Sequence, residues 1–484
     1  MKLNRRDFMK NSAIIAGGMG LTGCATTGFG SGPQVNNMCG FSNKPLDKVR
    51  IGFIGVGQRG HSAVDRLAKI ADVEIVALCD IREEKAKQSN VILKKNGRKP
   101  AQLFHSDENA WKKMCELDLD LVYICTPWAL HVPMAVYAME HGKHTAVEVP
   151  VATTLEECWQ IVDVSEKTQK HCVILENCCY DFFELLTLNM ARDGVFGELT
   201  HAEGAYIHNL SRRFQPRDGQ KSGSYKNWRF DQNRASTNPF GLSHGNPYST
   251  HGLGPVAQCL NVNRGNKIEF LSSMSSQEAA FTQSAIDLKR EKFQNVKDYR
   301  GDMNTTILKL NKGQTIMIQH DVSSPRPYSR IHMLQGSKGI ACKYPFPARI
   351  ALGSHNYGHK WLDKNEFRKI EKEYKHPLSA VIGGIARKVG GHGGMDFIMD
   401  YRLIYCLKHG IPMDMDVYDA AAWSAVTPLS YESVKGNGAS MKFPDFTRGA
   451  WKTNKPLDIV TVDPTKLPMF SKKMVHAAKQ LNVH

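Results

Sequence analysis

Three side chains in this sequence are suited to proton transfer. Tyr248 and His251 lie three positions apart in the segment NPYSTHGLGP, just before an apolar run, and Tyr180 ends the apolar segment HCVILENCCY. Imidazole titrates near neutral pH without help, and a phenol does so when its surroundings lower its pKa. We therefore predict that Tyr180, Tyr248 and His251 exchange protons with the hydroxyl groups of a substrate.

A glycine-rich turn near the start of the chain predicts a site for a dinucleotide. Gly55, Gly57 and Gly60 follow the apolar strand pattern of residues 49–54 in G-x-G-x-x-G spacing, and a helical pattern follows them. This spacing permits a tight turn, close approach of the backbone to a pyrophosphate, and packing of the helix on the strand. Asp80 ends the next strand, where a carboxylate accepts hydrogen bonds from ribose hydroxyls and disfavours a 2′-phosphate. NAD is therefore predicted in preference to NADP.

Strands and helices alternate over residues 46–178, which predicts a parallel sheet with helices on both faces. Ligands of such sheets bind beyond the carboxyl ends of the strands. This rule adds further side chains to the predicted nucleotide crevice: Gln58, Arg59, Pro127, Trp128, His131, Glu148, Val149 and Asn177.

The second half of the chain has a different pattern. From about Leu199, strands are separated by turns, which predicts an antiparallel sheet, and a long polar and aromatic insertion starts at Arg212. Long loops inside a compact domain are usually functional, and flat rings with polar tips suit the recognition of sugars. The fold class is therefore α/β, with a Rossmann-type parallel-sheet domain over residues 46–178 and a second α/β domain over residues 179–445. Residues 446–484 are expected to pack on the body as a tail.

Composition excludes several classes of protein. Of the 484 residues, 42% are hydrophobic and 23% are charged, as in an ordinary globular chain that can bury a core. The formal net charge of +16 is scattered rather than gathered in a basic groove, so we expect no nucleic-acid partner. The twelve cysteines show neither C-x-x-C nor zinc-finger spacing, and no metal site is predicted. The adjacent Cys178 and Cys179 are expected to stay free thiols, because neighbouring cysteines rarely reach disulfide geometry.

Residues 1–24 have the character of an export signal. The segment NRRDFMK resembles a twin-arginine signal, a weakly apolar run follows, and LTGC resembles a lipobox that ends at Cys24. These features predict export by the twin-arginine route, lipidation of Cys24, and a periplasmic or membrane-anchored lipoprotein. Residues 25–45 have the composition of a linker. No later stretch is long and apolar enough to span a bilayer, so contact with the membrane is expected only through the lipid.

The motifs GFIGVGQRG, VALCD, YICTPWALHVPMAVYAMEHGKHTAVEVP and VFGEL resemble the Gfo/Idh/MocA oxidoreductase family over the chain after residue 46. The resemblance implies a nucleotide domain followed by a domain with an open, largely antiparallel sheet, and a homo-oligomer. In typical sugar dehydrogenases of that family, a Glu-Lys-Pro lysine helps to deprotonate the substrate alcohol. This chain has Glu148, Val149 and Pro150 there, so the lysine has no occupant, while Glu148 matches the residue that would hold the nicotinamide ribose.

A narrower set of motifs, ENCCY, NWR, YSTHGLGP, SSPRPYSR, NYGHKW and GHGGMDF, is similar to glycoside hydrolase family 109, the NAD-dependent α-N-acetylgalactosaminidases. That resemblance implies NAD contacts from Gln58, Arg59, Asp80, Trp128, Ala129, Leu130, His131, Glu148, Val149, Asn177 and Tyr248. It implies sugar contacts from Tyr206, Arg229, Tyr248, Ser249, Thr250, His251 and Tyr328. His392 and Tyr357 are further candidates, each equally consistent with a structural role.

The implied activity is removal of a terminal α-linked N-acetylgalactosamine from a glycan by transient oxidation. Bound NAD would take a hydride from sugar C3, the acidified C2 proton would be removed, the C1 leaving group would depart, water would add, and the hydride would return. Tyrosine and histidine would serve where a dehydrogenase uses lysine, and no pair of carboxylates is required. Two alternatives stay open at this point: a periplasmic NAD(P)-dependent sugar oxidoreductase with the same fold, and a nucleotide-holding binding protein without activity.

Overall fold

The computed structural model describes residues 30, 32–211, 245–294, 301–353 and 358–463. Its first half contains a six-stranded sheet of order β3-β2-β1-β4-β5-β6, in which every pair of neighbours is parallel. The strands are β1 (Val49–Ile54), β2 (Val73–Cys79), β3 (Gln102–Phe104), β4 (Leu121–Ile124), β5 (His144–Val147) and β6 (Cys172–Ile174). The strand order reverses between β1 and β4, which is where ligands of such sheets bind. The predicted parallel sheet is confirmed.

Helices join these strands and begin where local chemistry favours it. They are α2 (Gln58–Leu67), α3 (Glu83–Lys95), α4 (Ala110–Cys115), α5 (His131–Glu140) and α6 (Leu155–Thr168), with a short η1 (Trp128–Leu130) before α5. The start of α6 is a capping box, in which Thr154 and Glu157 satisfy each other's backbone N–H groups. By contrast, α2 begins at Gly57 without a side-chain cap, as expected for a helix start that receives a ligand.

The second half contains an eight-stranded sheet of order β13-β12-β11-β7-β10-β9-β8-β14. The strands are β7 (Leu199–Ile207), β8 (Ile268–Ser275), β9 (Asn304–Leu310), β10 (Thr315–Asp321), β11 (Met333–Gly336), β12 (Gly339–Cys342), β13 (Arg349–Leu352) and β14 (Met441–Lys442). Among these described strands, β7 and β10 form a parallel pair and the other neighbours are antiparallel. The predicted change to a largely antiparallel sheet is confirmed.

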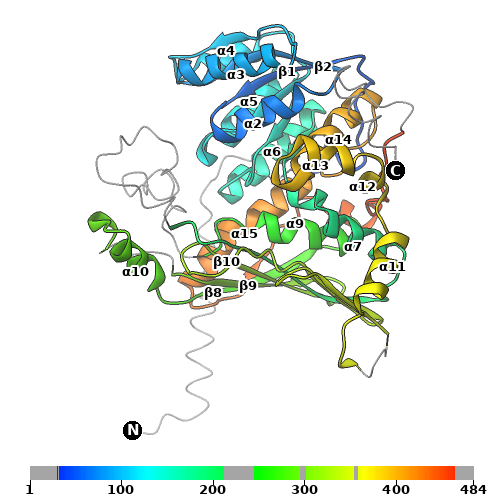
Figure 1. The fold of residues 1–484 in the computed structure, drawn as a ribbon. Helices are drawn as coiled ribbons and strands as arrows, with labels where there is room; N and C mark the ends of the chain where they lie inside the picture. Colours follow the sequence, from blue (N-terminus) through cyan, green and yellow to red (C-terminus); the bar gives the residue numbers. More distant parts are fainter. Residues whose placement is uncertain (1–29, 31, 212–244, 295–300, 354–357, 464–484) are drawn as a thin grey trace.

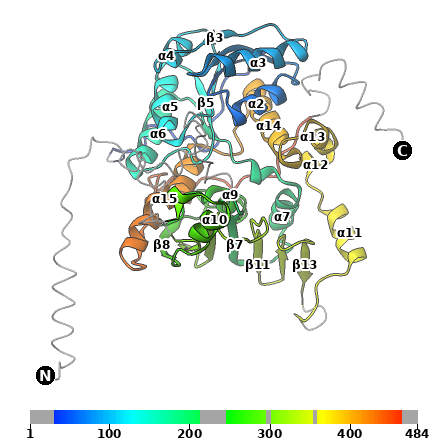
Figure 2. The same ribbon diagram turned by 60° about the vertical axis from the view of Figure 1, so that its left-hand side comes forward.

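Helices of the second half lie between the two sheets (Figures 1 and 2). They include η2 (Asn177–Tyr180), α7 (Phe182–Arg192), α9 (Thr250–Cys259), α14 (Met395–His409) and α15 (Val417–Lys435), while α10 (Ala280–Asp287), α11 (Lys364–Glu373), α12 (Pro377–Val381) and α13 (Gly383–Val389) lie further out. Helix α15 is buried on nearly all sides because it contacts α6 and β6 of the first half as well as β8 of the second. The helices nearest the C-terminus therefore return to the first sheet and join the two halves.

Helix α9 lies directly on β7 through two glycines. A Cβ atom on Gly204 would come within 2.2 Å of the Gly252 carbonyl oxygen, and one on Gly252 within 2.4 Å of the Ala205 nitrogen. Contacts this short are impossible for any other residue, so the two backbones touch. Because His251 precedes Gly252 and Tyr206 follows Ala205, this contact sets the distance between two side chains predicted to form the site.

Both ends of the described chain pack against the rest of the molecule. In the segment predicted as a linker, Gln34 Nε2 and the Met38 N–H donate to the Tyr418 hydroxyl at 2.7 and 3.1 Å. In the predicted tail, the Thr461 carbonyl accepts from Arg402 Nη1 at 2.9 Å, which places the tail against α14. None of the described helices is long and apolar enough to cross a membrane.

Two buried histidines make the folded state sensitive to acid. His144 and His171 begin or precede β5 and β6, their ring centroids lie 4.9 Å apart, and the His171 N–H donates to His144 Nδ1 at 3.0 Å. Burial lowers the pKa of His171 to about 4 and that of His144 well below its usual value. Their stabilising effect is complete above the ordinary histidine pKa of 6.5 and is lost as pH falls from there toward 4, because only the unfolded chain binds these protons.

We expect the free energy of unfolding in urea to fall by about 2 kcal/mol per such histidine between pH 7 and pH 5. The variant His171→Phe should reduce this slope, because phenylalanine fills the same apolar site without a proton to bind. The exposed His141→Phe serves as the control and should keep the slope of the parent. If the free energy of unfolding changed equally with pH in all three proteins, the acid sensitivity would not come from His171.

Candidate active site

The turn after β1 is built to admit a dinucleotide. A Cβ atom on Gly60 would lie 2.0 Å from the Gly55 carbonyl oxygen, so α2 packs against the turn in a way that only glycine permits. A Cβ atom on Gly57 would meet no atom nearer than 3.5 Å, so backbone is open to a ligand at this point. The residues at this turn therefore fit the pyrophosphate of NAD at the start of α2.

Asp80 lies at the end of β2 and closes the adenosine side of the crevice. Its carboxylate accepts from the Val56 N–H at 3.1 Å and from Arg82 N–H and Nε at 3.0 and 3.3 Å. These bonds hold the carboxylate beside the turn. A carboxylate has about four acceptor positions, so Asp80 keeps capacity for ribose hydroxyls, as the sequence predicts.

Arg59 joins the crevice to the second half of the chain. Its Nη2 lies 2.8 Å from Glu148 Oε1, and its Nη1 lies 3.2 Å from Asp396 Oδ2 at the start of α14. Asn177 Nδ2 donates to the other oxygen of Asp396, and His392 Nδ1 lies 2.9 Å from Oδ2. Arg59, Asn177 and His392, which the sequence places in or near the site, therefore meet at the Asp396 carboxylate, and Glu148 is joined to it through Arg59.

Asp396 is buried, and burial alone would raise its pKa. The hydrogen bond from His392 and the charges of Arg59 and Arg66 instead hold the pKa of Asp396 well below its usual range. Removing one partner from such a buried ion group is costly because the opposing charges lose their compensation.

Asp396→Asn should therefore destabilise the fold by about 3 kcal/mol and loosen the bound cofactor. The first effect is measured as a fall in melting temperature, and the second as NAD released by acid from protein that has passed a desalting column. The control is Asp65→Asn, which removes a half-buried carboxylate that pairs with Lys69 on α2 and has no contact with Asp396 among the described ion pairs. Parent levels of both stability and bound NAD in Asp396→Asn would contradict this role.

The segment after β4 brings Trp128 to the mouth of the crevice. His131 is fully buried, and its two ring nitrogens lie 2.8 Å from the carbonyl oxygens of Pro150 and Thr126. It therefore fixes the loops on either side rather than facing a ligand. Val149 is buried in the core, so the position at which related dehydrogenases carry lysine presents no titratable group to the crevice.

A cluster of aromatic rings lies where the two halves meet. The ring centroid of Tyr248 lies 4.8 Å from His251, 4.9 Å from Tyr206 and 5.8 Å from Trp128, whose ring is nearly parallel to it. Tyr206 and His251 are 5.4 Å apart. The structure thus brings Tyr206, Tyr248 and His251 together beside Trp128 of the nucleotide domain, and Tyr328 adjoins Tyr206 at 6.3 Å.

A buried carboxylate orients His251. His251 Nδ1 lies 2.7 Å from Oε1 of Glu176, which is fully buried and also accepts from the Cys178 N–H at 3.0 Å. Burial raises the pKa of Glu176, but the His251 ring, Thr250 and the Cys178 N–H together lower it below its usual value. An ionised Glu176 keeps the proton on Nδ1, so that Nε2, which has no hydrogen-bond partner among the described residues, can accept or donate a proton.

The thiol of Cys178 lies beside this pair. Ligand-type atoms of Glu176, Cys178 and His251 lie within 4.8 Å of one another, as in no other group of the described residues. Burial raises the pKa of the Cys178 thiol well above its usual value, which keeps it protonated and opposes coordination of a metal. Cys178 and Cys179 are both free thiols, as predicted.

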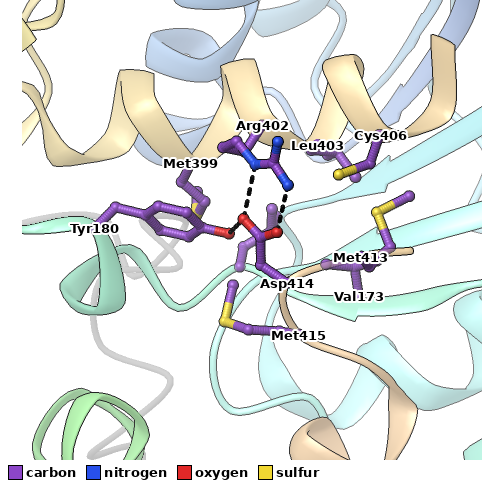
Figure 3. A pocket seen from close by; sticks show the side chains of 10 residues that line it. Val173, Tyr180, Met399, Arg402, Leu403, Cys406, Met413, Asp414 and Met415 are labelled. Atoms are coloured by element: carbon purple, nitrogen blue, oxygen red, sulfur yellow. Dashed lines mark hydrogen bonds and ion pairs between the residues drawn. The ribbon is translucent and has the colours of Figure 1, made fainter. Parts of the chain in front are cut away.

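Tyr180 lies apart from the ring cluster, and Figure 3 shows the residues that surround it instead. Its hydroxyl donates to Asp414 Oδ2 at 3.0 Å, and Arg402 binds both oxygens of Asp414 at 2.9 and 2.6 Å. These groups line a small cavity together with methionines 399, 413 and 415. Burial raises the pKa of Tyr180 well above its usual value. The structure therefore does not bring Tyr180 to Tyr248 and His251, and its phenol anchors η2 instead.

Tyr180→Phe tests this position. We expect turnover to stay within about an order of magnitude of the parent, while the melting temperature falls by several degrees because Asp414 loses one hydrogen bond. Phe196→Leu, a core change before the start of β7 and so at the opposite end of that strand from Tyr206, provides a protein of reduced stability for comparison. A loss of turnover of about a thousandfold in a normally folded variant would show instead that Tyr180 takes part in proton transfer.

The remaining predicted residues fall into three groups. Gln58 at the start of α2 and Ala129 and Leu130 in η1 are exposed. Ser249 Oγ donates to the Trp423 carbonyl at 3.0 Å and Thr250 is buried, so both side chains face the protein interior. Arg229, Tyr357 and Cys24 lie outside the described residues.

Sequence reasoning missed several residues of the site: Glu176, Arg66, His208, His320 and Asp396. Glu176 precedes Asn177 at the end of β6, where the strand-end rule could have found it. Asp396 lies inside the quoted segment GHGGMDF, whose histidine alone was considered.

Comparisons with known proteins identify relatives of both halves. Residues 49–176 match the NAD-binding Rossmann fold of the Gfo/Idh/MocA oxidoreductase family, and residues 180–453 match the C-terminal domain of glycosyl hydrolase 109. The chain is 48% identical over 428 residues to an α-N-acetylgalactosaminidase of Bacteroides fragilis, covering 87% of this chain and 97% of that protein. It is 46% identical over 419 residues to a glycosyl hydrolase family 109 protein of Porphyromonas gingivalis, covering 84% and 86%.

Solved structures show the same fold at low identity. A levoglucosan dehydrogenase in complex with NADH and levoglucosan superposes with a TM-score of 0.60 at 16% identity, covering 82% of this chain and 100% of that one. An NAD-binding oxidoreductase from Klebsiella pneumoniae gives 0.62 at 15% identity, covering 83% and 100%.

Proposed function

Because the chain belongs to glycosyl hydrolase family 109 and carries an NAD-binding Rossmann domain, we propose that it removes terminal α-linked N-acetylgalactosamine from glycans by an NAD-dependent route. The observation that carries the mechanism is the pair of His251 and Glu176 within the ring cluster of Tyr206 and Tyr248, beside Trp128 of the nucleotide domain. A sugar bound there contacts proton-transfer groups and the dinucleotide crevice together.

The residues of the site divide the work. NAD, when bound in the crevice, would supply the reversible redox chemistry needed at sugar C3. His251 and Tyr248 accept and donate the protons of the C3 hydroxyl, of C2 and of the leaving oxygen at C1. Glu176 holds the imidazole and stabilises its protonated form. The C1–O bond breaks with departure of the glycan, a water oxygen replaces it, and the electrons balance without an external acceptor.

Arg59, Asp80, Trp128, Glu148 and Asn177 hold the cofactor in this proposal, and Tyr206 and Tyr328 face the sugar. The buried Val149 supports a route in which no lysine serves as base.

The test mixes purified mature protein, without added NAD, with nitrophenyl N-acetyl-α-D-galactosaminide. Nitrophenol release without accumulation of reduced cofactor supports the proposal. Reduced cofactor formed in proportion to free sugar and added NAD, without glycoside cleavage, would overturn it in favour of a sugar oxidoreductase. Binding without either reaction would favour a non-catalytic protein.

We further propose export by the twin-arginine route and anchoring through a lipid on Cys24, supported by the sequence of residues 1–24. In cells that express Cys24→Ser, the protein should move from the membrane fraction to the soluble periplasm. An unchanged membrane fraction would contradict the anchor. The resemblance to the oxidoreductase family also supports a homo-oligomer, which light scattering tests.

A further inference from the structure

A series of aromatic rings leads away from the ring cluster. Tyr328 lies 6.3 Å from Tyr206, Tyr344 lies 5.8 Å from Tyr328, and Phe346 lies 4.6 Å from Tyr344, all measured between ring centroids. The series starts at the proposed sugar site and ends at a side chain that is 67% exposed. Successive ring centroids are no more than 6.3 Å apart, so packed rings connect Phe346 to the site.

Strand topology explains why these rings share one edge of the second sheet. Strands β7 and β10 are parallel and both end there, with Tyr206 opposite His320. Strand β11 starts at the same edge, and β12 ends there because Met333 pairs with Cys342. The segments between β10 and β11 and between β12 and β13 therefore lie side by side at the edge that carries Tyr206.

Buried charges hold the second and third rings of the series, Tyr328 and Tyr344. Arg330 Nη1 donates to the Tyr328 hydroxyl at 2.9 Å, and its guanidinium carbon lies 5.7 and 5.8 Å from the centroids of the Tyr328 and Tyr344 rings. Lys343 Nζ lies 5.6 Å from the Tyr344 ring and 2.7 Å from Glu184. Arg330, Lys343 and Glu184 are all buried, so the rings above them are held in place rather than free to collapse onto a ligand.

Phe346 differs from the other three rings because the protein leaves most of its apolar surface uncovered. Most of its side chain faces water, whereas Tyr344 is 7% exposed. Pro345 and Pro347 flank it and restrict the backbone. A large apolar ring kept in water on a restricted loop, next to a ligand site, is the arrangement used to stack on a flat partner.

We propose that Phe346 forms a subsite for the sugar on the leaving side of the cleaved bond, with Tyr344 supporting its ring. The inference rests on the proposed function, in which a terminal sugar occupies the ring cluster and the rest of the glycan must leave the crevice. The occupant is the pyranose ring one or two positions inside the chain end, whose C–H face lies on the phenyl ring. Phe346 thereby selects oligosaccharides over simple glycosides.

The experiment compares two substrates in the parent and in Phe346→Ala. One is methyl N-acetyl-α-D-galactosaminide, which has no leaving-side ring, and the other is a trisaccharide that ends in α-linked N-acetylgalactosamine. We expect kcat/KM for the trisaccharide to fall about tenfold while that for the methyl glycoside stays unchanged. Phe346→Trp should retain the parent's preference for the trisaccharide over the methyl glycoside. The control is Ile307→Ala, which shortens a side chain that is 51% exposed on β9 and should change neither value.

Equal effects of Phe346→Ala on both substrates, or none on either, would overturn the subsite. A change in molar mass by light scattering with unchanged selectivity would also overturn it, and would make Phe346 a contact between copies of the chain. Failure of the parent protein to cleave either substrate is a different result, because it refutes the proposed function and the subsite with it.

Discussion

His251→Ala should lower kcat by about three orders of magnitude while the protein keeps its cofactor. A buried carboxylate orients this imidazole, and alanine leaves neither a proton acceptor nor a proton donor in its place. NAD should remain bound, because the carboxylates and glycines that fit the dinucleotide lie on the first domain and on α14. The kcat is measured with the nitrophenyl glycoside. The bound cofactor is measured as the amount of NAD that acid releases per chain.

His201→Ala is the matched control for this change. His201 is on β7 like Tyr206, but its side chain points to the other face of the sheet, where Nδ1 lies 2.7 Å from the Thr315 hydroxyl. It should leave turnover within about threefold of the parent, as surface changes usually do. Turnover of His251→Ala at the level of this control would exclude His251 from proton transfer.

Glu176→Gln should lower kcat by about two to three orders of magnitude with little change in melting temperature. Glutamine has the shape of glutamate, so its carbonyl oxygen in the place of Oε1 can still accept from the Cys178 N–H and from His251 Nδ1. Its neutral amide, however, lacks the negative charge that stabilises the protonated imidazole. The kcat for the methyl glycoside should fall as much as that for a nitrophenyl glycoside, because both reactions need Nε2 as a base.

The pH profile separates this role from a loss of packing. Because the pKa of Glu176 is lowered in the folded protein, its carboxylate stays ionised and its support of His251 is lost only as pH falls through that lowered value. The parent should therefore show no step from Glu176 near the ordinary glutamate pKa of 4.5. Glu203→Gln, on the outer face of β7, is the control. A Glu176→Gln variant with parent kcat and an unshifted profile would remove Glu176 from the mechanism.

The sequence predicted the first sheet because glycine spacing and strand alternation are local signals. The boundaries of β1, residues 49–54, follow directly from the apolar run. The return of α15 to that sheet could not be predicted in the same way. A helix that is apolar on nearly all sides shows no preferred face, so its partners α6, β6 and β8 follow only from tertiary packing.

The site was predicted in part for a similar reason. Glu148 and Asn177 follow strands, where the rule for parallel sheets places ligands, and Arg59 lies at the start of α2 after the glycine turn. The structure joins Arg59 and Asn177 to Asp396, and Glu148 to Arg59. Glu176 and Tyr180 belong to the same short segment, yet the first faces His251 and the second faces Asp414. A 3-10 turn redirects successive side chains through angles that the sequence pattern does not reveal.

The contact of Gly204 with Gly252 has a consequence for anyone who wishes to retarget this enzyme by laboratory evolution. Even one added carbon at either position would push α9 off β7 and carry His251 away from Tyr206. Libraries that spare these two glycines and vary the ring series instead leave the catalytic distances intact while changing what is recognised. Substitutions that change substrate preference can therefore be sought in the ring series, whereas substitutions at Gly204 or Gly252 are expected to yield inactive protein.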